Sequence, residues 1–381
     1  MIRLIKNATI YLPLQVLNQG WLVIQDGTIE KIGVGEPPSP IDGDTYDAQG
    51  QRLLPGFIDI HVHGAMGHES MDASSEGLIS MAQYYAQHGV TSFLPTTWAA
   101  PFDSLLPVFA NIHLTMGRSY KGAQILGTHV EGPFIHPAKA GAQNPAAIYP
   151  ATQKLIDQLL AQGIVKLVTL APEIPENQQI IPLLHSRGVA ISAGHTTATY
   201  EEMEEAVALG VSSVTHTFNA MPPLHHREPG AVGAALLMDE LSCEVIADNI
   251  HLHPAILKMV ARLKTAANMI LVTDAIRGTG LPDGEYPIDE RTITIRNGEA
   301  RLPNGNLAGS TLTMERAFRN MLTATGWNID ELLPAATLTP ARLIGIQDRK
   351  GSIEIGKDAD MIIIDDEINV INTFVAGNLV H

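Results

Sequence analysis

Short runs rich in Val, Ile and Leu recur along this chain, and five of them close on polar residues. The runs read FIDIHVHG, THVEGPF, ISAGHT, VTHTFN and LVTDA. A strand buried in a parallel sheet is ordinarily apolar throughout, so packing does not explain these polar residues. They are typical of a barrel, where chemistry takes place at the carboxyl ends of the strands. The polar residues are His61, His63, Glu131, His195, His216 and Asp274.

Strand-like and helical segments alternate through the middle of the chain. Strands are predicted at 57–64, 90–97, 123–131, 165–172, 189–195, 212–218, 243–250 and 269–275. Helices are predicted at 73–89, 197–210 and 253–266, where apolar residues recur at helical spacing and Gly or Pro marks an end. This alternation indicates parallel β/α units. It predicts an α/β fold, a (β/α)8 TIM barrel; a doubly wound open sheet is the alternative, but no G-x-G-x-x-G follows the first strand.

The segment after the eighth predicted strand departs from this alternation. Residues 285–307 are predicted to form a hairpin-like insertion. The run LAGSTLTMERAFRNML should then supply the last barrel helix, with Ser310 or Thr311 as its N-cap.

Both ends of the chain have the pattern of β-structure. The N-terminal part alternates apolar and polar residues, with Asp26-Gly27 marking a hairpin, and the C-terminal part has short strands without a helical period. Neither part could bury its apolar face alone. We therefore expect a small, discontinuous β-sandwich domain of residues 1–53 and 347–381, and a barrel domain of residues 54–346.

Composition excludes several classes of protein. With 40 acidic and 24 basic residues the net charge is −16, which argues against nucleic acid and against an anionic membrane surface as partners. The single cysteine, Cys243, precludes a disulfide framework and is interpreted as a small buried apolar residue. No run of about 18 apolar residues predicts a membrane span, and Lys6 and Asn7 interrupt the only candidate leader. The cytoplasm is the expected compartment.

The polar strand ends predict a metal site. His61 and His63 stand at i and i+2 on one strand and so point to the same side, where two imidazoles can share a metal. Glu131 can ligate one ion or bridge two, and His195 and His216 end neighbouring strands. Asp59 and His129 share the parity of these residues and are expected to support them. Nitrogen and oxygen donors favour Zn²⁺, and Fe²⁺, Co²⁺ or Ni²⁺ also fit.

Asp274 is predicted to be the general acid–base. It follows the apolar run MILVT, where an unpaired carboxylate would be costly. In a closed barrel the eighth strand adjoins the first, which brings this carboxylate beside the histidine pair. A metal can lower the pKa of a bound water to roughly 7. Asp274 would accept the proton released and deliver it to the leaving group.

Longer motifs narrow the prediction to a family. HVHG, HVEGPF, GAQNP, AGHT, HTFNAMPPLHHREPG, ADNIH, LVTDA and LAGS closely resemble those of the N-acetylglucosamine-6-phosphate deacetylases, within the amidohydrolase superfamily. The resemblance covers nearly the whole chain; the C-terminal GSIEIGKDAD is shared widely across the superfamily. It implies metal-dependent hydrolysis of the acetamido group of N-acetyl-D-glucosamine 6-phosphate to D-glucosamine 6-phosphate and acetate. That reaction belongs to amino-sugar catabolism and cell-wall sugar recycling.

The resemblance also implies roles for particular residues. Glu131, His195 and His216 would be ligands, and because His61 and His63 are retained, we expect two ions bridged by Glu131 rather than one. The family is commonly homodimeric, with Arg227 or His251 reaching the neighbouring subunit's site; the guanidinium fork of Arg227 matches a phosphate. The substrate contacts implied are Ala142, Gln143, Asn219, Ala220, Arg227, His251, Leu307, Ala308 and Gly309. Some relatives carry His in place of Gln143, which leaves carbonyl polarisation by this position open.

Two alternatives remain. Another amidohydrolase, acting on an N-acyl amino acid or a cyclic amide, would share the barrel and the metal. Such enzymes usually carry a carbamylated Lys ligand on strand four, whereas Lys166 stands at the start of that strand and Glu131 suits the role better. A non-catalytic scaffold on the same barrel is the other alternative. Such proteins typically lose ligands, and this chain has kept every one.

Overall fold

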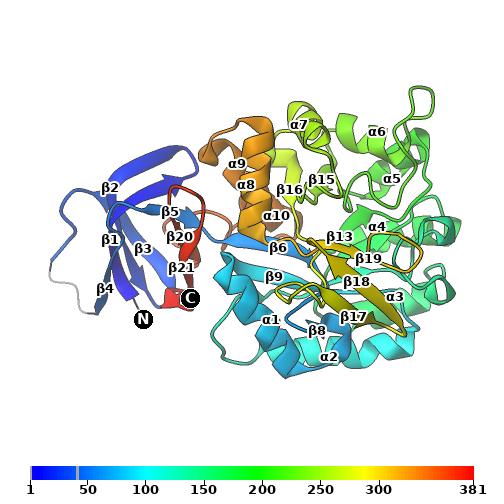
Figure 1. Ribbon diagram of the computed structural model, residues 1–381, viewed down its shortest axis with the longest axis horizontal. Coiled ribbons are helices and arrows are strands. Elements are labelled where there is room, and N and C mark those ends of the chain that lie inside the picture. Colours follow the sequence, from blue (N-terminus) through cyan, green and yellow to red (C-terminus); the bar gives the residue numbers. More distant parts are fainter. Residues whose placement is uncertain (1, 40–42) are drawn as a thin grey trace.

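The computed structural model describes residues 2–39 and 43–381. Residue 1 and residues 40–42, which fall in the first predicted domain, lie outside the described residues. A β-sheet built from both termini lies at one end of the molecule and a barrel at the other, with helices α8 to α10 beside the junction (Figure 1).

The central domain is a closed parallel barrel. Its strands are β6 (Phe57–Val62), β9 (Val90–Thr97), β11 (Thr128–Glu131), β12 (Val165–Leu170), β13 (Ala190–Ala193), β14 (Ser213–Val214), β15 (Ser242–Val245) and β16 (Met269–Leu271). Neighbours pair in parallel in this order, and a parallel bridge between Val62 and Ala275 links the first strand to the last. The predicted (β/α)8 TIM barrel is confirmed.

Helices surround the barrel. They are α1 (Ser75–Gln87), α2 (Phe102–Met116), α3 (Gln153–Leu160), α4 (Pro175–Ser186), α5 (Tyr200–Leu209), α6 (Gly230–Leu237), α7 (Pro254–Leu263) and α8 (Met314–Thr325). The three predicted helices are present with shorter ends. In α5 the Thr199 side chain accepts the Glu202 N–H while the Glu202 carboxylate accepts the Thr199 N–H, a capping box that fixes the start of the helix. Pro254 is the first residue of α7, as expected.

The prediction that Ser310 or Thr311 caps the last barrel helix was wrong. Thr313 occupies the N-cap position of α8. The Ser310 hydroxyl instead donates to the Thr273 carbonyl, and the Ser310 backbone pairs with Ala275. These contacts hold the segment beside the end of the eighth strand, so the helix begins later.

Two other predicted segments are subdivided. The third predicted strand, 123–131, consists of β10 (Gln124–Ile125) and β11, separated at Gly127, whose φ is 146°. The insertion is a three-stranded sheet of β17 (Gly284–Ile288), β18 (Arg291–Arg296) and β19 (Glu299–Arg301). It buries a small apolar core of its own against Ala142 and Ile276.

The terminal strands form one eight-stranded sheet. In sheet order they are β22 (Asn378–Leu379), β21 (Val370–Val375), β20 (Met361–Ile364), β5 (Arg52–Pro55), β1 (Ile2–Leu12), β2 (Gln15–Gln25) and β3 (Thr28–Val34), with β4 (Asp44–Asp47) also on β1. Ile29 and Phe374, from strands far apart in this order, share one apolar core. The sheet therefore folds over onto itself, as predicted for a sandwich. The domain boundaries at residues 53 and 347 stay predictions; β5 crosses the first of them.

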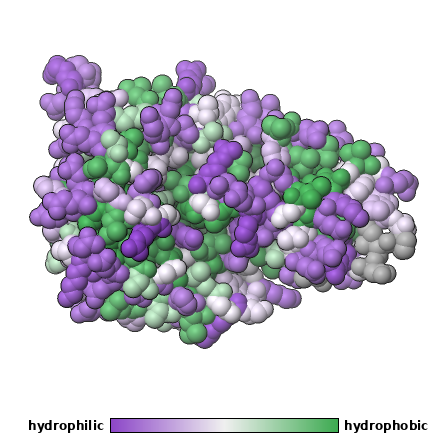
Figure 2. Space-filling view, turned by 180° about the vertical axis from the view of Figure 1, so that it is seen from behind, coloured by the Kyte–Doolittle hydropathy of each residue, from purple (hydrophilic) through white to green (hydrophobic). Residues whose placement is uncertain are grey.

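The surface is largely polar. Hydrophilic side chains cover much of the face opposite to that of Figure 1, with smaller hydrophobic areas between them (Figure 2). Among the described residues, no helix combines the length and the apolar character that crossing a bilayer requires.

Candidate metal centre and active site

The six predicted site residues all lie at the carboxyl end of the barrel. His61 lies in β6 with His63 just after it, and Glu131 ends β11. The other three, His195, His216 and Asp274, come two or three residues after the ends of β13, β14 and β16. The last three have φ of 47°, 30° and 51°, in the left-handed region that non-glycine residues rarely adopt. Such backbone costs about 1–3 kcal/mol per residue and is concentrated at functional sites. It also turns the chain out of the sheet, which is why these strands end earlier than predicted.

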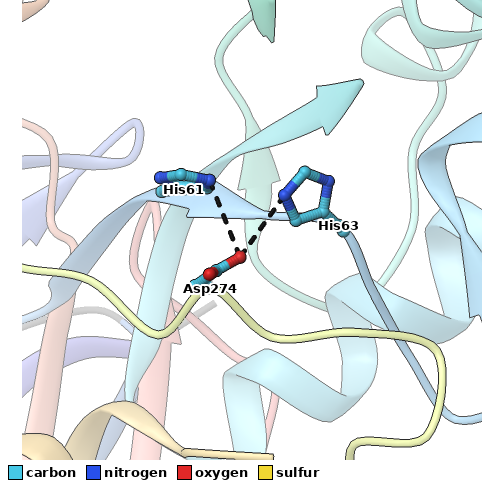
Figure 3. Close-up of side chains that lie close together, drawn as sticks. All are labelled: His61, His63 and Asp274. Carbon is cyan, nitrogen blue, oxygen red and sulfur yellow. Dashed lines mark ion pairs between the residues drawn. The ribbon is translucent and has the colours of Figure 1, made fainter. Parts of the chain in front are cut away.

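One group of donors joins the first strand to the last. The Asp274 Oδ1 atom lies 3.3 Å from His63 Nε2 and 3.7 Å from His61 Nε2. Figure 3 shows both imidazoles, on and just after β6, directed toward this carboxylate on the chain after β16. All three side chains are buried, and their ligand atoms lie within 4.8 Å of one another. The predicted closeness of Asp274 to the histidine pair is thus present.

A second group comes from three further strands. Glu131 Oε1, His195 Nε2 and His216 Nε2 lie 3.1 Å from one another on every side. Four ligands in a tetrahedron around Zn²⁺, at bonds of 2.0–2.1 Å, are separated by about 3.3 Å. The triangle therefore has nearly the size that one ion requires.

Glu131 lies between the two groups. Its Oε1 is 3.5 Å from His61 Nε2 and its Oε2 is 3.2 Å from His63 Nε2. The Nε2 atoms of His61 and His63 are buried without a hydrogen-bond partner. Buried polar atoms are normally satisfied, so unpartnered imidazole nitrogens facing carboxylates fit absent cations. The donor set therefore fits a divalent-metal site, with Glu131 in contact with histidines of both groups.

The electrostatics agree with this reading. Burial opposes charge on Glu131, but the surrounding imidazoles hold its pKa well below the ordinary value. Burial likewise opposes charge on His61, yet Glu131 and Asp274 raise its pKa well above the ordinary value. Among the described residues, no Lys or Arg lies within 4.0 Å of either carboxylate. Positive charge must come from imidazole protons or from metal ions that displace them.

Sequence reasoning missed two residues that support the ligands. Glu244, on β15, places Oε2 3.0 Å from His61 Nδ1. The Trp98 ring stacks on the His63 ring, with centroids 3.7 Å apart and planes 11° from parallel. Glu244 had the same signal as Asp274, an acid within an apolar run, but that run was interpreted only for its cysteine.

The two supporting residues that were expected do lie against the ligands. Asp59 Oδ1 accepts the N–H of His61 and of Thr273, which ties the first strand to the eighth. The His129 ring packs edge-on against the His61 ring, with centroids 4.6 Å apart, and Nε2 lies 2.7 Å from the Thr169 hydroxyl. Burial, followed by the nearby His61, lowers the pKa of His129 well below its ordinary value, so it remains neutral.

A pocket of about 370 Å³ opens onto the donors. Besides Glu131, His195, His216 and Asp274, its lining includes the predicted contacts Ala142, Asn219, Ala220, His251, Leu307 and Gly309. Three predicted contacts do not line it. Gln143 is buried behind the wall and donates from Nε2 to Glu131 Oε2 at 2.7 Å, and Ala308 is fully buried. Arg227 is exposed, with its guanidinium 2.8 Å from His226 Nε2.

Comparison with known proteins identifies the family to which the chain belongs. Residues 52–380 match the model of the Amidohydrolase family. The chain belongs to this amidohydrolase family. It is 38% identical to N-acetylglucosamine-6-phosphate deacetylase of Bacillus subtilis (strain 168), over 99% of this chain and 96% of that protein. It is 36% identical to N-acetylgalactosamine-6-phosphate deacetylase of Escherichia coli O157:H7, over 95% of this chain and 96% of that protein.

A solved structure gives the same result. The crystal structure of N-acetylglucosamine-6-phosphate deacetylase from Pasteurella multocida superposes with a TM-score of 0.94 at 30% identity, over 100% of this chain and 99% of that one. This amidohydrolase is therefore a hydrolase acting on a linear amide, and its His, Glu and Asp donors could hold a divalent metal. Lys166 is the second residue of β12, at the end of the barrel away from the pocket. It does not offer the strand-four ligand of the alternative amidohydrolases.

Proposed function

We propose that the chain hydrolyses the 2-acetamido group of N-acetyl-D-glucosamine 6-phosphate, giving D-glucosamine 6-phosphate and acetate. The observation that carries the proposal is that two buried donor groups, one of which contains Asp274, lie together and present four of their members to a pocket of about 370 Å³. These four are Glu131, His195, His216 and Asp274. Pockets that bind small molecules have volumes of this order. The names of the relatives supply the substrate class.

For the metal centre we propose two Zn²⁺ ions, with Fe²⁺, Co²⁺ or Ni²⁺ as substitutes. His61 and His63 would hold one ion and His195 and His216 the other, with Glu131 between them. The nitrogen-rich donor set and the 3.1 Å triangle support this choice. When bound, the ions would polarise the amide carbonyl and lower the pKa of a water molecule to roughly 7.

Asp274 is proposed to move the proton. Burial opposes its charge, but His61 and His63 keep its pKa below the ordinary value. At neutral pH it is therefore a carboxylate, able to accept a proton from water and then give it to the departing amine. Its position in the lining of the pocket, 3.3 Å from His63 Nε2, supports this role.

The rest of the pocket is proposed to bind the sugar. Ala142 would lie by the acetamido group, and Gln143, which does not line the pocket, would act there through its hydrogen bond to Glu131. Asn219 and Ala220 would contact the sugar through their backbone, and His251 would donate a hydrogen bond. His251 is held by Asp248, whose Oδ2 lies 2.6 Å from its Nδ1. The segment 307–309, containing Leu307, Ala308 and Gly309, would close the other side.

Arg227 is proposed to anchor the phosphate of a neighbouring subunit's substrate, in a homodimer. Its exposure, outside the lining of its own pocket, supports a role across an interface. A guanidinium can bind phosphate through two parallel hydrogen bonds. We also propose that the enzyme works in the cytoplasm, because sugar phosphates do not cross membranes freely.

Acetate release from three substrates tests the proposal. The enzyme loaded with Zn²⁺ should act on N-acetylglucosamine 6-phosphate faster than on N-acetylgalactosamine 6-phosphate, and much faster than on unphosphorylated N-acetylglucosamine. A higher rate on the galactose epimer would reassign the substrate. Equal rates with and without phosphate would reject the phosphate anchor. No acetate from any of them would reject deacetylation.

A further inference from the structure

Glu244 is a carboxylate for which the reaction described so far has no use. It lies in β15 between Cys243 and Val245, and its side chain is fully buried. Among the described residues, its only ion-pair partner within 4.0 Å is His61. Moving a carboxylate from water into a protein interior costs several kcal/mol unless it is compensated, so this placement requires a reason.

One oxygen of Glu244 contacts both donor groups. Oε2 lies 3.0 Å from Nδ1 of His61, which belongs to the group with His63 and Asp274. The same atom accepts the backbone N–H of His216, from the other group, at 3.1 Å. The second oxygen, Oε1, is buried without a partner. Glu244 therefore links the two groups from behind.

The contact to His61 determines which nitrogen faces the ions. An ionised carboxylate only accepts hydrogen bonds, so Nδ1 of His61 must carry the proton. Nε2, which faces Glu131 and Asp274, is then the nitrogen whose proton a metal ion can displace. A carboxylate behind a ligating imidazole also makes that imidazole a more basic ligand.

The other three imidazoles lack this support. Nδ1 of His195 lies 2.7 Å from the Lys139 carbonyl oxygen, a neutral acceptor. Nδ1 of His63 and Nδ1 of His216 are buried without a hydrogen-bond partner. Among the described residues, His61 is thus the one histidine of the two donor groups whose Nδ1 lies against a carboxylate.

We propose that Glu244 is a positioning residue of the metal centre: it fixes the tautomer and orientation of His61 and, through the His216 backbone, couples the two donor groups. The inference rests on the proposed metal centre. It adds a requirement that the ligand set alone does not contain, namely that a residue contacting neither ion nor substrate controls metal affinity.

The test measures metal affinity in Glu244→Gln, which keeps the shape of the side chain and removes its charge. Zn²⁺ affinity is measured by competition with a chromophoric chelator, together with metal content by mass spectrometry. We expect affinity to weaken about 10–100-fold, the range found when the group behind a metal ligand is changed. The matched control is Glu315→Gln, which alters a second Glu–His pair away from the pocket. In that pair Glu315 Oε1 lies 2.9 Å from His88 Nδ1. This control variant should bind Zn²⁺ as the unmodified protein does.

Thermal unfolding distinguishes positioning from simple structural support. A structural role would lower Tm equally with and without metal. A positioning role leaves the metal-free Tm of Glu244→Gln near that of the unmodified protein and reduces only the rise in Tm on adding Zn²⁺. An equal fall in Tm in both states would overturn the proposal, as would unchanged Zn²⁺ affinity.

A second variant covers failure of the first to fold. Glu244→Asp keeps the charge but withdraws the carboxylate from His61, so its Zn²⁺ affinity should also fall; unmodified affinity would overturn the proposal. The unmodified protein separates this inference from the proposed function. If it binds no Zn²⁺, the metal centre itself is rejected, whereas binding that is insensitive to both Glu244 variants rejects only the role of Glu244.

Discussion

Two clusters of buried carboxylates in this molecule are neutralised in different ways. In the terminal domain, Lys350 forms ion pairs with Asp358 and Asp360, and the Lys350 and Asp360 side chains are 4% and 5% exposed. At the barrel rim, Glu131 and Asp274 have no Lys or Arg partner among the described residues and are surrounded by imidazoles. A cluster with its own fixed cation is complete without a ligand. A cluster that lacks one is built for an exchangeable ion.

The KDAD motif near the C-terminus, which was predicted only to be common across the superfamily, has a structural role in this terminal cluster. Besides pairing with Lys350, Asp360 accepts the Ala376 N–H through Oδ1 at 2.8 Å. Its carbonyl oxygen accepts the Gly56 N–H at 3.0 Å. The motif thus ties together the segments that enter and leave the terminal sheet.

Removing metal should have the largest effect, and it should affect the barrel-rim cluster but not the terminal cluster. Dialysis against a chelator should abolish acetate release, and adding Zn²⁺ should restore it. At a Zn²⁺ concentration 1,000-fold above Kd, the bound ion should stabilise the folded state by about 4 kcal/mol. Calorimetry with and without chelator measures this shift. Full activity in the chelated protein would contradict the assignment of the rim cluster as a metal centre.

Asp274→Asn should have the next largest effect. The amide cannot accept a proton from water, so kcat should fall about 10²–10⁴-fold, the usual contribution of general acid–base catalysis. Zn²⁺ content should remain near that of the unmodified protein, because five other donors are retained. Steady-state kinetics and metal analysis on the same sample check both statements. Unchanged kcat would remove Asp274 from the mechanism.

Lys350→Met tests the terminal cluster. Removing the lysine leaves the buried Asp360 carboxylate without a cation, at a cost of about 3–5 kcal/mol in unfolding free energy. Urea denaturation measures the loss, while Zn²⁺ affinity should not change. Arg349→Met is the matched control, because Arg349 pairs with the same Asp358 at 2.9 Å but is 70% exposed. An exposed pair contributes about 0–1 kcal/mol. Equal losses in the two variants would contradict the distinction between buried and surface pairs.

The smallest expected effect concerns the chemical reactivity of Cys243. It tests whether the outer side of the barrel wall is closed to solvent. The Cys243 thiol donates to the Ala235 carbonyl at 3.2 Å, on the helix side of β15, and burial raises its pKa to about 11. At pH 8 only about a thousandth of such a thiol is ionised, against roughly a quarter for an ordinary cysteine. Reaction with a disulfide reagent should therefore be at least about 100-fold slower in the native protein than in urea. Comparable rates would show that this side of the strand is open to solvent.

Local sequence patterns were enough to predict the architecture and the ligand candidates. Periodicity located the β/α units, and β9 was predicted to the residue. Polar residues closing apolar runs identified Glu131 and Asp274, because a buried strand offers few other reasons for a carboxylate. The cysteine was also interpreted correctly, since it is buried and unpaired.

The exact strand ends, the role of Glu244 and the position of Arg227 depend on tertiary contacts and could not be predicted from local patterns. Strand ends moved because His216 and two other site residues have left-handed backbone, which tertiary contacts impose against local preference. The role of Glu244 could be inferred only from the closed barrel, which places β15 behind His61. The two residues are 183 positions apart in the sequence. Arg227 was expected at the phosphate, yet its own pocket does not include it, since the path of a loop depends on its neighbours. Residue type gives the chemistry available, but distance, burial and the placement of charge are set by contacts between segments remote in sequence.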